Sequence, residues 1–173
     1  QFENFMIGIA HYPAQGYGGI HVYECEFINN QLAGIRIDGT ELFDFFGCSF
    51  EIPVEIYNTW QYEQALQQFC PKLTGQPGCL NPNPFETASF GIYVNDMSAP
   101  MNVEKCEFFT PSNDQDVNFN YPRDRVALRV PSSATIGPSG AISTFDFYAF
   151  DNTFTNMNEA FRFEGAENMR TLN

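Results

Sequence analysis

Two short phrases recur along the chain, and this internal repeat restricts the possible folds more than any other feature of the sequence. The stretch Gly34–Glu41 returns near the end as Ala160–Glu167, with the same alternation of apolar and polar residues. A second phrase precedes each of these stretches, at Ile20–Phe27 and at Phe147–Phe154. Two more copies of each phrase lie between the first and the last copy. Repeated supersecondary units bury their apolar surface by stacking on one another, so the repeat favours a solenoid over a globular enzyme domain.

The phrase before each Gly-Ile stretch predicts two short strands joined by a bend. If the position of Cys25 is counted as zero, apolar residues recur at −5, −3, 0 and +2, which is period-two alternation broken once. An amphipathic helix would instead space its apolar residues three and four apart. We therefore expect these positions to face a common core in every copy. They are Ile20, Val22, Cys25 and Phe27; Phe43, Phe45, Cys48 and Phe50; Met101, Val103, Cys106 and Phe108; and Phe147, Ala149, Asn152 and Phe154.

The spacing of the repeat predicts three short strands per turn of the solenoid. The first two cysteine positions are 23 residues apart, and longer spacings indicate insertions, which we place at residues 51–89 and 110–124. The first insertion contains the predicted helix, Thr59–Phe69, which Asn58 can cap. An apolar stripe on this helix is expected to pack back on the strands. The stripe consists of Tyr62, Leu66 and Phe69.

The phrases resemble the coils of the right-handed parallel β-helix in the pectate-lyase-like superfamily. The residues that carry the resemblance are Gly19–Val22 with Cys25–Asn30, Gly91–Val94, and Asn152–Asn156. The resemblance implies an all-β fold, a right-handed parallel β-helix (solenoid) of about four to five coils with one short helix-bearing insertion. This family includes polysaccharide lyases and hydrolases, phage tailspikes and bacterial surface proteins, so the resemblance leaves the function open.

The repeat also predicts how the chain is organised as a whole. We expect residues 1–173 to form a single β-helix segment, because the repeat runs from one end of the sequence to the other. A parallel solenoid exposes apolar core and unpaired strand edges at its ends. We therefore expect the segment either to belong to a longer chain or to be capped by neighbouring copies of itself.

The five cysteines fall into two groups. Cys70 and Cys79 lie in a stretch rich in Pro and Gly, where a disulfide that closes a short loop is the natural inference. Such a bond favours an extracellular or cell-surface location, because disulfides persist in oxidising compartments. The other three cysteines share one position of the repeat with an asparagine, and the family resemblance places the four in an inward ladder. The ladder consists of Cys25, Cys48, Cys106 and Asn152.

One outward position of the Gly-Ile phrase collects cationic residues, although the chain has only eight Lys and Arg. The residues at this position are Arg36, Tyr93, Arg129 and Arg162. Stacked arginines repel one another unless anions compensate them. Two interpretations stay open: a wall of ion pairs with residues two positions further on, or a groove that binds an acidic glycan. The residues two positions further on include Asp38, Asn95 and Glu164.

A second outward column lies two residues before the cysteine position and is mostly aromatic. It consists of Tyr23, Phe46, Glu104 and Phe150. Aromatic side chains on the outside of a sheet can stack on sugar rings, or they can be covered by the insertions or by a neighbouring subunit. The sequence alone does not distinguish these two possibilities.

Composition restricts the partners that such a chain can have. The formal charge is −13, from 21 acidic and 8 basic residues, which argues against nucleic acid because phosphate binding needs clustered cations. No apolar run approaches the ~20 residues that span a bilayer, so we expect no membrane insertion. Carbohydrate or neighbouring copies of the chain remain as the expected partners.

No catalytic motif is recognisable in the sequence. Enzymes of the resembled family use converging carboxylates, with bound calcium or with paired Asp, whereas the carboxylates here are scattered. We expect a structural or adhesive segment of a secreted or cell-surface protein, able to form fibres or filaments. The alternative is a polysaccharide-degrading enzyme or a tailspike-type glycan-binding protein. No cofactor is expected, and calcium has one weak candidate site: Asp114, Asp116 and Asn118.

Overall fold

In a computed structural model, most of the described residues belong to short strands. The structure describes residues 1–12, 19–38, 42–53, 56, 59–70, 83–96, 101–111, 123–130 and 147–163. The strands in the first half are β1 (Phe2–Glu3), β2 (Ile7–His11), β3 (Ile20–Tyr23), β4 (Glu26–Ile28), β5 (Ala33–Asp38), β6 (Phe43–Phe46) and β7 (Ser49–Glu51). Those in the second half are β8 (Ala88–Asp96), β9 (Met101–Glu104), β10 (Glu107–Phe109), β11 (Asp124–Val130), β12 (Phe147–Phe150), β13 (Thr153–Thr155) and β14 (Glu159–Phe163).

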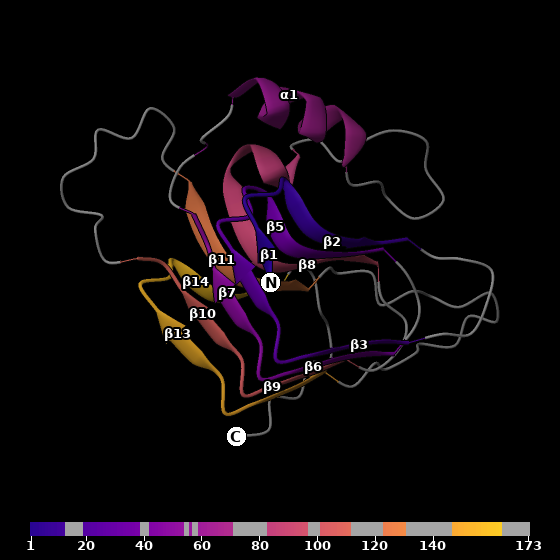
Figure 1. The fold of residues 1–173 in the computed structure, drawn as a ribbon, viewed down its shortest axis with the longest axis vertical. Coiled ribbons are helices and arrows are strands. Elements are labelled where there is room, and N and C mark those ends of the chain that lie inside the picture. Colours follow the sequence, from indigo (N-terminus) through magenta and orange to yellow (C-terminus); the bar gives the residue numbers. More distant parts are fainter. Residues whose placement is uncertain are drawn as a thin grey trace.

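The strands form three parallel sheets, which confirms the prediction of an all-β chain with little helix. Successive strands enter the sheets in a fixed cyclic order, so each sheet takes every third strand. Sheet 1 contains β1, β4, β7, β10 and β13; sheet 2 contains β2, β5, β8, β11 and β14; and sheet 3 contains β3, β6, β9 and β12. Figure 1 shows β3, β6 and β9 side by side along one wall of the molecule.

The predicted pair of strands joined by a bend is confirmed in each copy of the first phrase. Two residues separate the strand in sheet 3 from the strand in sheet 1, and the first of them lies in the left-handed backbone region. The residues at this bend are Glu24, Gly47, Lys105 and Asp151, with φ between 51° and 63°. Left-handed backbone turns the chain sharply within one residue, so two short strands can lie in different sheets although they are nearly contiguous in sequence.

The central core lies between the sheets and contains the predicted inward residues of the first three copies and Phe154 of the fourth. In the two middle copies, every inward residue is at most 1% exposed: Phe43, Phe45, Cys48, Phe50, Met101, Val103, Cys106 and Phe108. In the first and last copies, Ile20, Cys25 and Phe154 are only partly buried. The reason is that these residues lie near the outermost described strands, where a neighbouring copy packs on one side only.

Five phenylalanine rings form a continuous stack through this core. The centroid distances are 5.1, 4.8, 4.7 and 5.5 Å, and the interplanar angles do not exceed 11°. The stack consists of Phe2, Phe27, Phe50, Phe108 and Phe154. Glycine opens the second phrase because a Cβ on Gly34 would lie 2.8 Å both from the Phe50 ring and from the carbonyl oxygen of Gly91. The close approach of sheet 2 to the ring stack therefore requires glycine here.

A second apolar cluster covers the outer side of sheet 2. The first insertion supplies α1 (Thr59–Gln68) and the 3-10 helix η1 (Pro84–Glu86), and Figure 1 shows α1 over sheet 2 with sheet 3 on the opposite side. The predicted stripe of Tyr62, Leu66 and Phe69 packs in this cluster, which confirms that the helix folds back on the strands. The predicted cap, Asn58, lies outside the described residues. The buried residues of this second apolar cluster are Leu32, Ala33, Ala65, Phe85, Ala88, Phe90, Tyr93 and Val126.

Candidate functional site

The predicted cationic column is continuous in sheet 2, but most of it is buried. Arg36 is paired in register with Tyr93, Tyr93 with Arg129, and Arg129 with Arg162. Arg36, Tyr93 and Arg129 are only 4%, 0% and 2% exposed, whereas Arg162 is partly exposed. A glycan chain cannot lie along side chains that have no access to solvent. Arg36, Tyr93 and Arg129 therefore offer no open surface to an acidic glycan.

Each of the two buried arginines of this column contacts protein groups. Arg36 forms an ion pair with Asp38, with 2.5 Å between Nη2 and Oδ2, and its Nη1 donates to the carbonyl oxygen of Phe69 at 2.7 Å. The guanidinium of Arg129 lies 4.6 Å from the centroid of the Tyr93 ring, and its Nη1 donates to a carbonyl oxygen of β8 at 2.9 Å. Stacking on the Tyr93 ring stabilises the planar guanidinium, as an ion pair with a carboxylate would.

Arg162 is held by two carboxylates at the accessible end of the column. It binds Glu159 in a bidentate manner, at 2.7 Å from Nε to Oε2 and 2.5 Å from Nη2 to Oε1. Its Nη2 also lies 3.2 Å from Oδ2 of Asp124. The hydrogen bond from Arg162 holds the pKa of Glu159 below its usual value. Arg36 therefore pairs with the carboxylate two positions further on, as the ion-pair interpretation expects. Arg162 pairs with other carboxylates, and Glu164, two positions after it, lies outside the described residues. Arg129 stacks on an aromatic ring instead.

Another buried arginine, Arg123, was not predicted. Its Nε donates to Oγ of Ser89 at 3.0 Å, its Nη1 to the hydroxyl of Tyr62 at 2.9 Å, and its Nη2 to the carbonyl oxygens of Phe85, at 2.6 Å, and Ala88. Burial lowers the pKa of the Arg123 guanidinium. Arg123 thus ties α1, η1 and β8 together. No pattern could have identified it, because it lies outside the repeated phrases.

The predicted cysteine ladder runs between sheets 3 and 1. Backbone hydrogen bonds of 2.8 to 2.9 Å connect successive copies at the ladder. The amide of Ser49 donates to the carbonyl oxygen of Cys25, that of Glu107 to Cys48, and that of Thr153 to Cys106. Oδ1 of Asn152 accepts from the amide of Cys106 at 2.9 Å. Cys25, Cys48 and Cys106 are free thiols. The hydrogen bond with Cys48 and burial together raise the pKa of the Cys106 thiol.

We expect iodoacetamide to label Cys25 well before Cys48 and Cys106 in the native protein. Cys25 is partly exposed, whereas the other two are buried, and the thiolate is the reactive form. Labelling of a buried thiol waits for local opening, so its rate should be at least about tenfold lower. Peptide mass spectrometry measures the modified fraction at each site, with a denatured sample as control. Equal native rates at the three sites would contradict the buried ladder.

Two further sets of predicted residues lie partly or wholly outside the described chain. Cys70, which follows α1, is disulfide-bonded, and its predicted partner Cys79 lies outside the described residues. The calcium candidates Asp114, Asp116 and Asn118 also lie outside them. Within the described ranges, no group of three or more His, Cys, Asp or Glu side chains could hold a metal ion.

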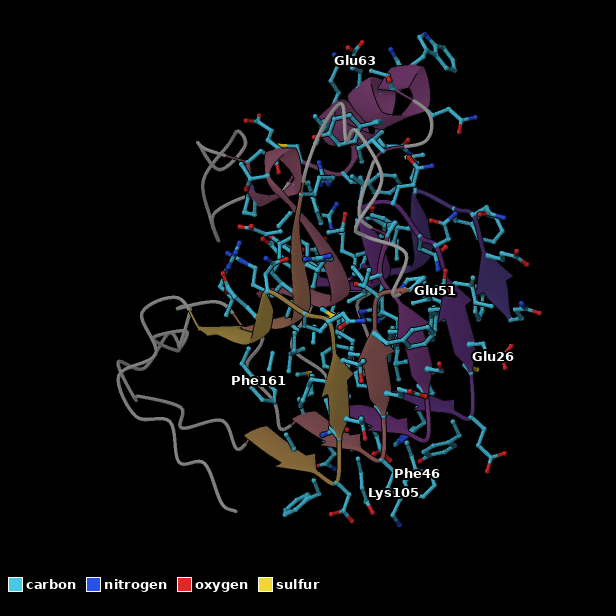
Figure 2. All side chains as sticks on the ribbon, turned by 90° about the vertical axis from the view of Figure 1, so that its left-hand side faces the viewer. Glu26, Phe46, Glu51, Glu63, Lys105 and Phe161 are labelled. Atoms are coloured by element: carbon cyan, nitrogen blue, oxygen red, sulfur yellow. The ribbon has the colours of Figure 1, made fainter. Side chains whose placement is uncertain are left out.

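The outer face of sheet 3 exposes the predicted aromatic column. Tyr23 is paired in register with Phe46, and Glu104 lies between Phe46 and Phe150. Tyr23 is 53% exposed and Phe150 is 42% exposed. This face lies on the side of the molecule opposite α1, and Figure 2 shows Phe46 and Lys105 pointing outward from it. The sequence left open whether this column binds sugar or is covered. The described part of the first insertion does not cover it.

Hydrogen-bonding groups lie directly beside these aromatic rings. The hydroxyl of Tyr23 donates to Oδ2 of Asp44 at 2.7 Å, and Nδ1 of His21 lies 3.3 Å from the same oxygen. The hydrogen bond to Asp44 raises the pKa of Tyr23. Nζ of Lys105 lies 5.0 Å from the centroid of the Phe46 ring. Ring faces and oriented polar groups are thus available to one ligand on one surface.

The polar half of this surface was not predicted from the sequence. His21, Asp44 and Asn102 are paired in register, two residues before the aromatic column on the same strands. Period-two alternation places residues two apart on the same face of a strand. The signal was therefore present in the sequence, and the same alternation that identified Tyr23 and Phe46 could have found these residues. We refer to the two columns together as the sheet 3 surface. It consists of His21, Tyr23, Asp44, Phe46, Asn102, Glu104 and Phe150.

The described residues contain no helix that is both long and apolar enough to span a bilayer. The one α-helix among the described residues, α1, has ten residues. A search against protein-family models, curated proteins and solved structures found no match to this chain.

Proposed function

We propose that this chain is a right-handed parallel β-helix that serves as a rigid structural or adhesive segment of an extracellular protein, with carbohydrate as its ligand. The cyclic order of the strands through three parallel sheets supports the solenoid part of the proposal. The continuous phenylalanine stack supports a rigid role, because like side chains on successive turns interlock along the whole length. The disulfide bond of Cys70 favours an oxidising compartment.

One observation carries the assignment of carbohydrate: aromatic side chains aligned in register on the exposed face of sheet 3. Sugars present apolar ring faces edged by hydroxyl groups. A surface for them needs aromatic faces next to donors and acceptors, as Tyr23 and Phe46 lie next to Asp44 and His21. Single exposed apolar residues are common on protein surfaces, whereas a contiguous group of them often marks an interaction site.

The charge of the chain favours a neutral glycan over an acidic one. The protein carries a formal charge of −13, and the sheet 3 surface contains Asp44 and Glu104. The cationic column on sheet 2 had suggested an acidic ligand. Its residues Arg36 and Arg129 are buried, however, and Arg162 is paired with carboxylates. A polyanionic polysaccharide would be repelled by this field, whereas a neutral one would not.

We expect Tyr23→Ala and Phe46→Ala each to weaken binding of a neutral glycan about tenfold, a change of about 1.4 kcal/mol. Each substitution removes a ring face that would contact the sugar. A glycan array with neutral and polyanionic polysaccharides identifies the ligand, and isothermal titration calorimetry of the best neutral ligand measures the affinities.

Trp60→Ala is the matched control for these variants. Trp60 is also an exposed aromatic residue, at 69%, but it lies on α1 and away from the sheet 3 surface. Its removal should leave the affinity unchanged. Equal losses in all three variants, or binding of polyanionic glycans alone, would overturn the proposal. Release of new reducing ends from a bound polysaccharide would instead identify the alternative function, a polysaccharide-degrading enzyme.

A further inference from the structure

We propose that Cys48 and Cys106 form a redox site in the core, where a small peroxide oxidises the two thiols to a disulfide that joins adjacent copies of the repeat. This inference goes beyond the proposed carbohydrate binding and does not depend on it. It concerns two buried nucleophilic side chains of the cysteine ladder, which the proposed function leaves unused.

The backbone holds these two cysteines at matching positions of neighbouring strands. Gly47 and Lys105, the residues directly before them, both have left-handed backbone, with φ of 63° and 53°. The flanking strands are paired in register on both sides, β6 with β9 and β7 with β10, and the amide of Glu107 donates to the carbonyl oxygen of Cys48 at 2.8 Å. Adjacent strands lie roughly 4.8 Å apart. This separation falls within the range of about 4.4 to 6.8 Å that Cα atoms show in disulfides.

The two thiols contact each other directly through a hydrogen bond. The thiol of Cys48 donates to the carbonyl oxygen of Val22 at 3.3 Å. Its proton is therefore engaged elsewhere, and its sulfur is free to accept from the thiol of Cys106. Since the separation of the strands already suits a disulfide, side-chain rotation can bring the two sulfur atoms into bonding distance.

The hydrogen bond between the thiols makes them chemically different. It lowers the pKa of the Cys48 thiol, because the thiol of Cys106 stabilises a negative charge on the Cys48 sulfur. The same hydrogen bond raises the pKa of the Cys106 thiol. The thiolate is the nucleophilic form of cysteine. Cys48 is therefore the residue that attacks a peroxide, and Cys106 is the residue that completes the disulfide.

With hydrogen peroxide as the oxidant, the reaction has two steps and releases two molecules of water. First the Cys48 thiolate attacks one peroxide oxygen, the O–O bond breaks, and a sulfenic acid forms while hydroxide leaves and takes up the proton that Cys48 had lost. Then the sulfur of Cys106 attacks the sulfur of Cys48, the S–O bond breaks, and the hydroxyl group leaves as water with the proton of Cys106. The two sulfur atoms together give up the two electrons that reduce the peroxide.

Burial selects the oxidant that can reach the pair. Cys48 and Cys106 are each 1% exposed, whereas Cys25, the third thiol of the ladder, is partly exposed. A bulky oxidant such as glutathione disulfide can exchange with Cys25, but it reaches the buried pair only when the core opens. Hydrogen peroxide is far smaller and needs a much smaller opening. We therefore expect peroxide, and not glutathione disulfide, to form the bond.

The disulfide would act as a covalent link between distant parts of the sequence. It would close a loop over residues 49–105, which include α1 and η1 on the outer side of sheet 2. A link across a long loop stabilises a protein mainly because it restricts the unfolded chain. We expect oxidation to lower the equilibrium constant for unfolding at least about tenfold.

Peptide mass spectrometry of the purified chain after treatment with equimolar hydrogen peroxide tests the proposal. The treated chain is denatured in dimedone, which traps sulfenic acids, and in iodoacetamide, which blocks thiols. A glutamate-specific protease, used without reductant, then places Cys25, Cys48, Cys70 and Cys106 on different peptides. We expect a linked pair of peptides that contain Cys48 and Cys106. In Cys106→Ser this link should be lost, and dimedone should trap a sulfenic acid at Cys48.

Cys25→Ser is the matched control. It removes the most accessible thiol of the same ladder, and it should leave the link between Cys48 and Cys106 unchanged. A wild-type chain in which Cys48 is linked to Cys25, or in which Cys48 and Cys106 both stay free thiols, would overturn the proposal without reference to any variant. Equal formation of the link by glutathione disulfide would overturn the selection of a small oxidant.

Urea unfolding followed by circular dichroism measures the effect of the link on stability. The wild-type chain and Cys25→Ser should unfold at a higher urea concentration after peroxide treatment, whereas Cys106→Ser should show no such gain. A link that forms without stabilising the chain would refute its role as a covalent link between distant segments. Glycan binding by the reduced chain would leave the proposed function intact in every case.

Discussion

Arg123→Ala is expected to lower the free energy of unfolding by about 3 to 5 kcal/mol, because a hydrogen bond from a charged group contributes about 1.5 to 3 kcal/mol and the substitution removes several at once. The carbonyl oxygen of Ala88 loses its guanidinium donor, the carbonyl oxygen of Phe85 keeps only the donor that Tyr62 supplies, and the Tyr62 hydroxyl loses one of its partners. These groups lie on three different elements of the cover over sheet 2. Urea unfolding followed by circular dichroism measures the change.

Arg125→Ala is the control for this prediction. Arg125 lies two residues further along, in β11, and its described hydrogen bonds go to Oδ1 of Asn158 at the surface. Its removal should cost well under about 1 kcal/mol, as is usual for an exposed position. The loss of stability in Arg123→Lys should lie between those of the two alanine variants. The compact ammonium of lysine cannot donate to all the groups that the planar guanidinium reaches. If Arg123→Ala proved as stable as Arg125→Ala, Arg123 would not hold the cover in place.

Gly91→Val is expected to destabilise the protein by about 3 kcal/mol, at the upper end of the cost of overpacking a core. A Cβ at this position would lie 2.6 Å from Cδ1 of Phe108 and 2.7 Å from the carbonyl oxygen of Ala127. Neither group can move away easily, because the ring is stacked between two others and the carbonyl belongs to the adjacent strand. Thermal unfolding by differential scanning calorimetry gives the difference.

The chain contains its own control for Gly91 at Ala127. The register of β8 and β11 makes Gly91 and Ala127 neighbours at the same position of the repeat, and Ala127 already carries a Cβ. Ala127→Gly should therefore cost only about 0.5 to 1 kcal/mol, mainly through the greater flexibility of glycine in the unfolded chain. A larger loss from Ala127→Gly than from Gly91→Val would contradict the close approach of sheet 2 to the ring stack.

Much of the strand arrangement could be predicted from the repeat. Phe43, Phe45 and Phe50 were assigned to the core from period-two alternation alone, and all three are buried. The bend between the two strands was likewise predicted, from the single break in that alternation, and Gly47 occupies it. These features are local: strand geometry places residues two apart on one face, and a repeated phrase places the same residues there in every copy.

The candidate site could be predicted only in part. The column with Tyr23, Phe46 and Phe150 was identified as outward-facing, but the sequence could not decide between a sugar-binding surface and a covered one. The opposite problem arose for Arg36 and Arg129, which face outward from sheet 2 and are nevertheless buried. Alternation along a strand tells which face a residue is on, and it carries no information about what lies over that face.

The sequence by itself determined which side chains face the core and which form outward columns, because these depend on the period of the strand and on the repeat. Only the tertiary structure decided which outward column is accessible. That outcome depends on the placement of α1 and η1, which pack over sheet 2 and do not cover sheet 3. Contacts between distant segments, such as those of Arg123 with Tyr62 and Phe85, fix this placement. No pattern within a short stretch of sequence encodes them.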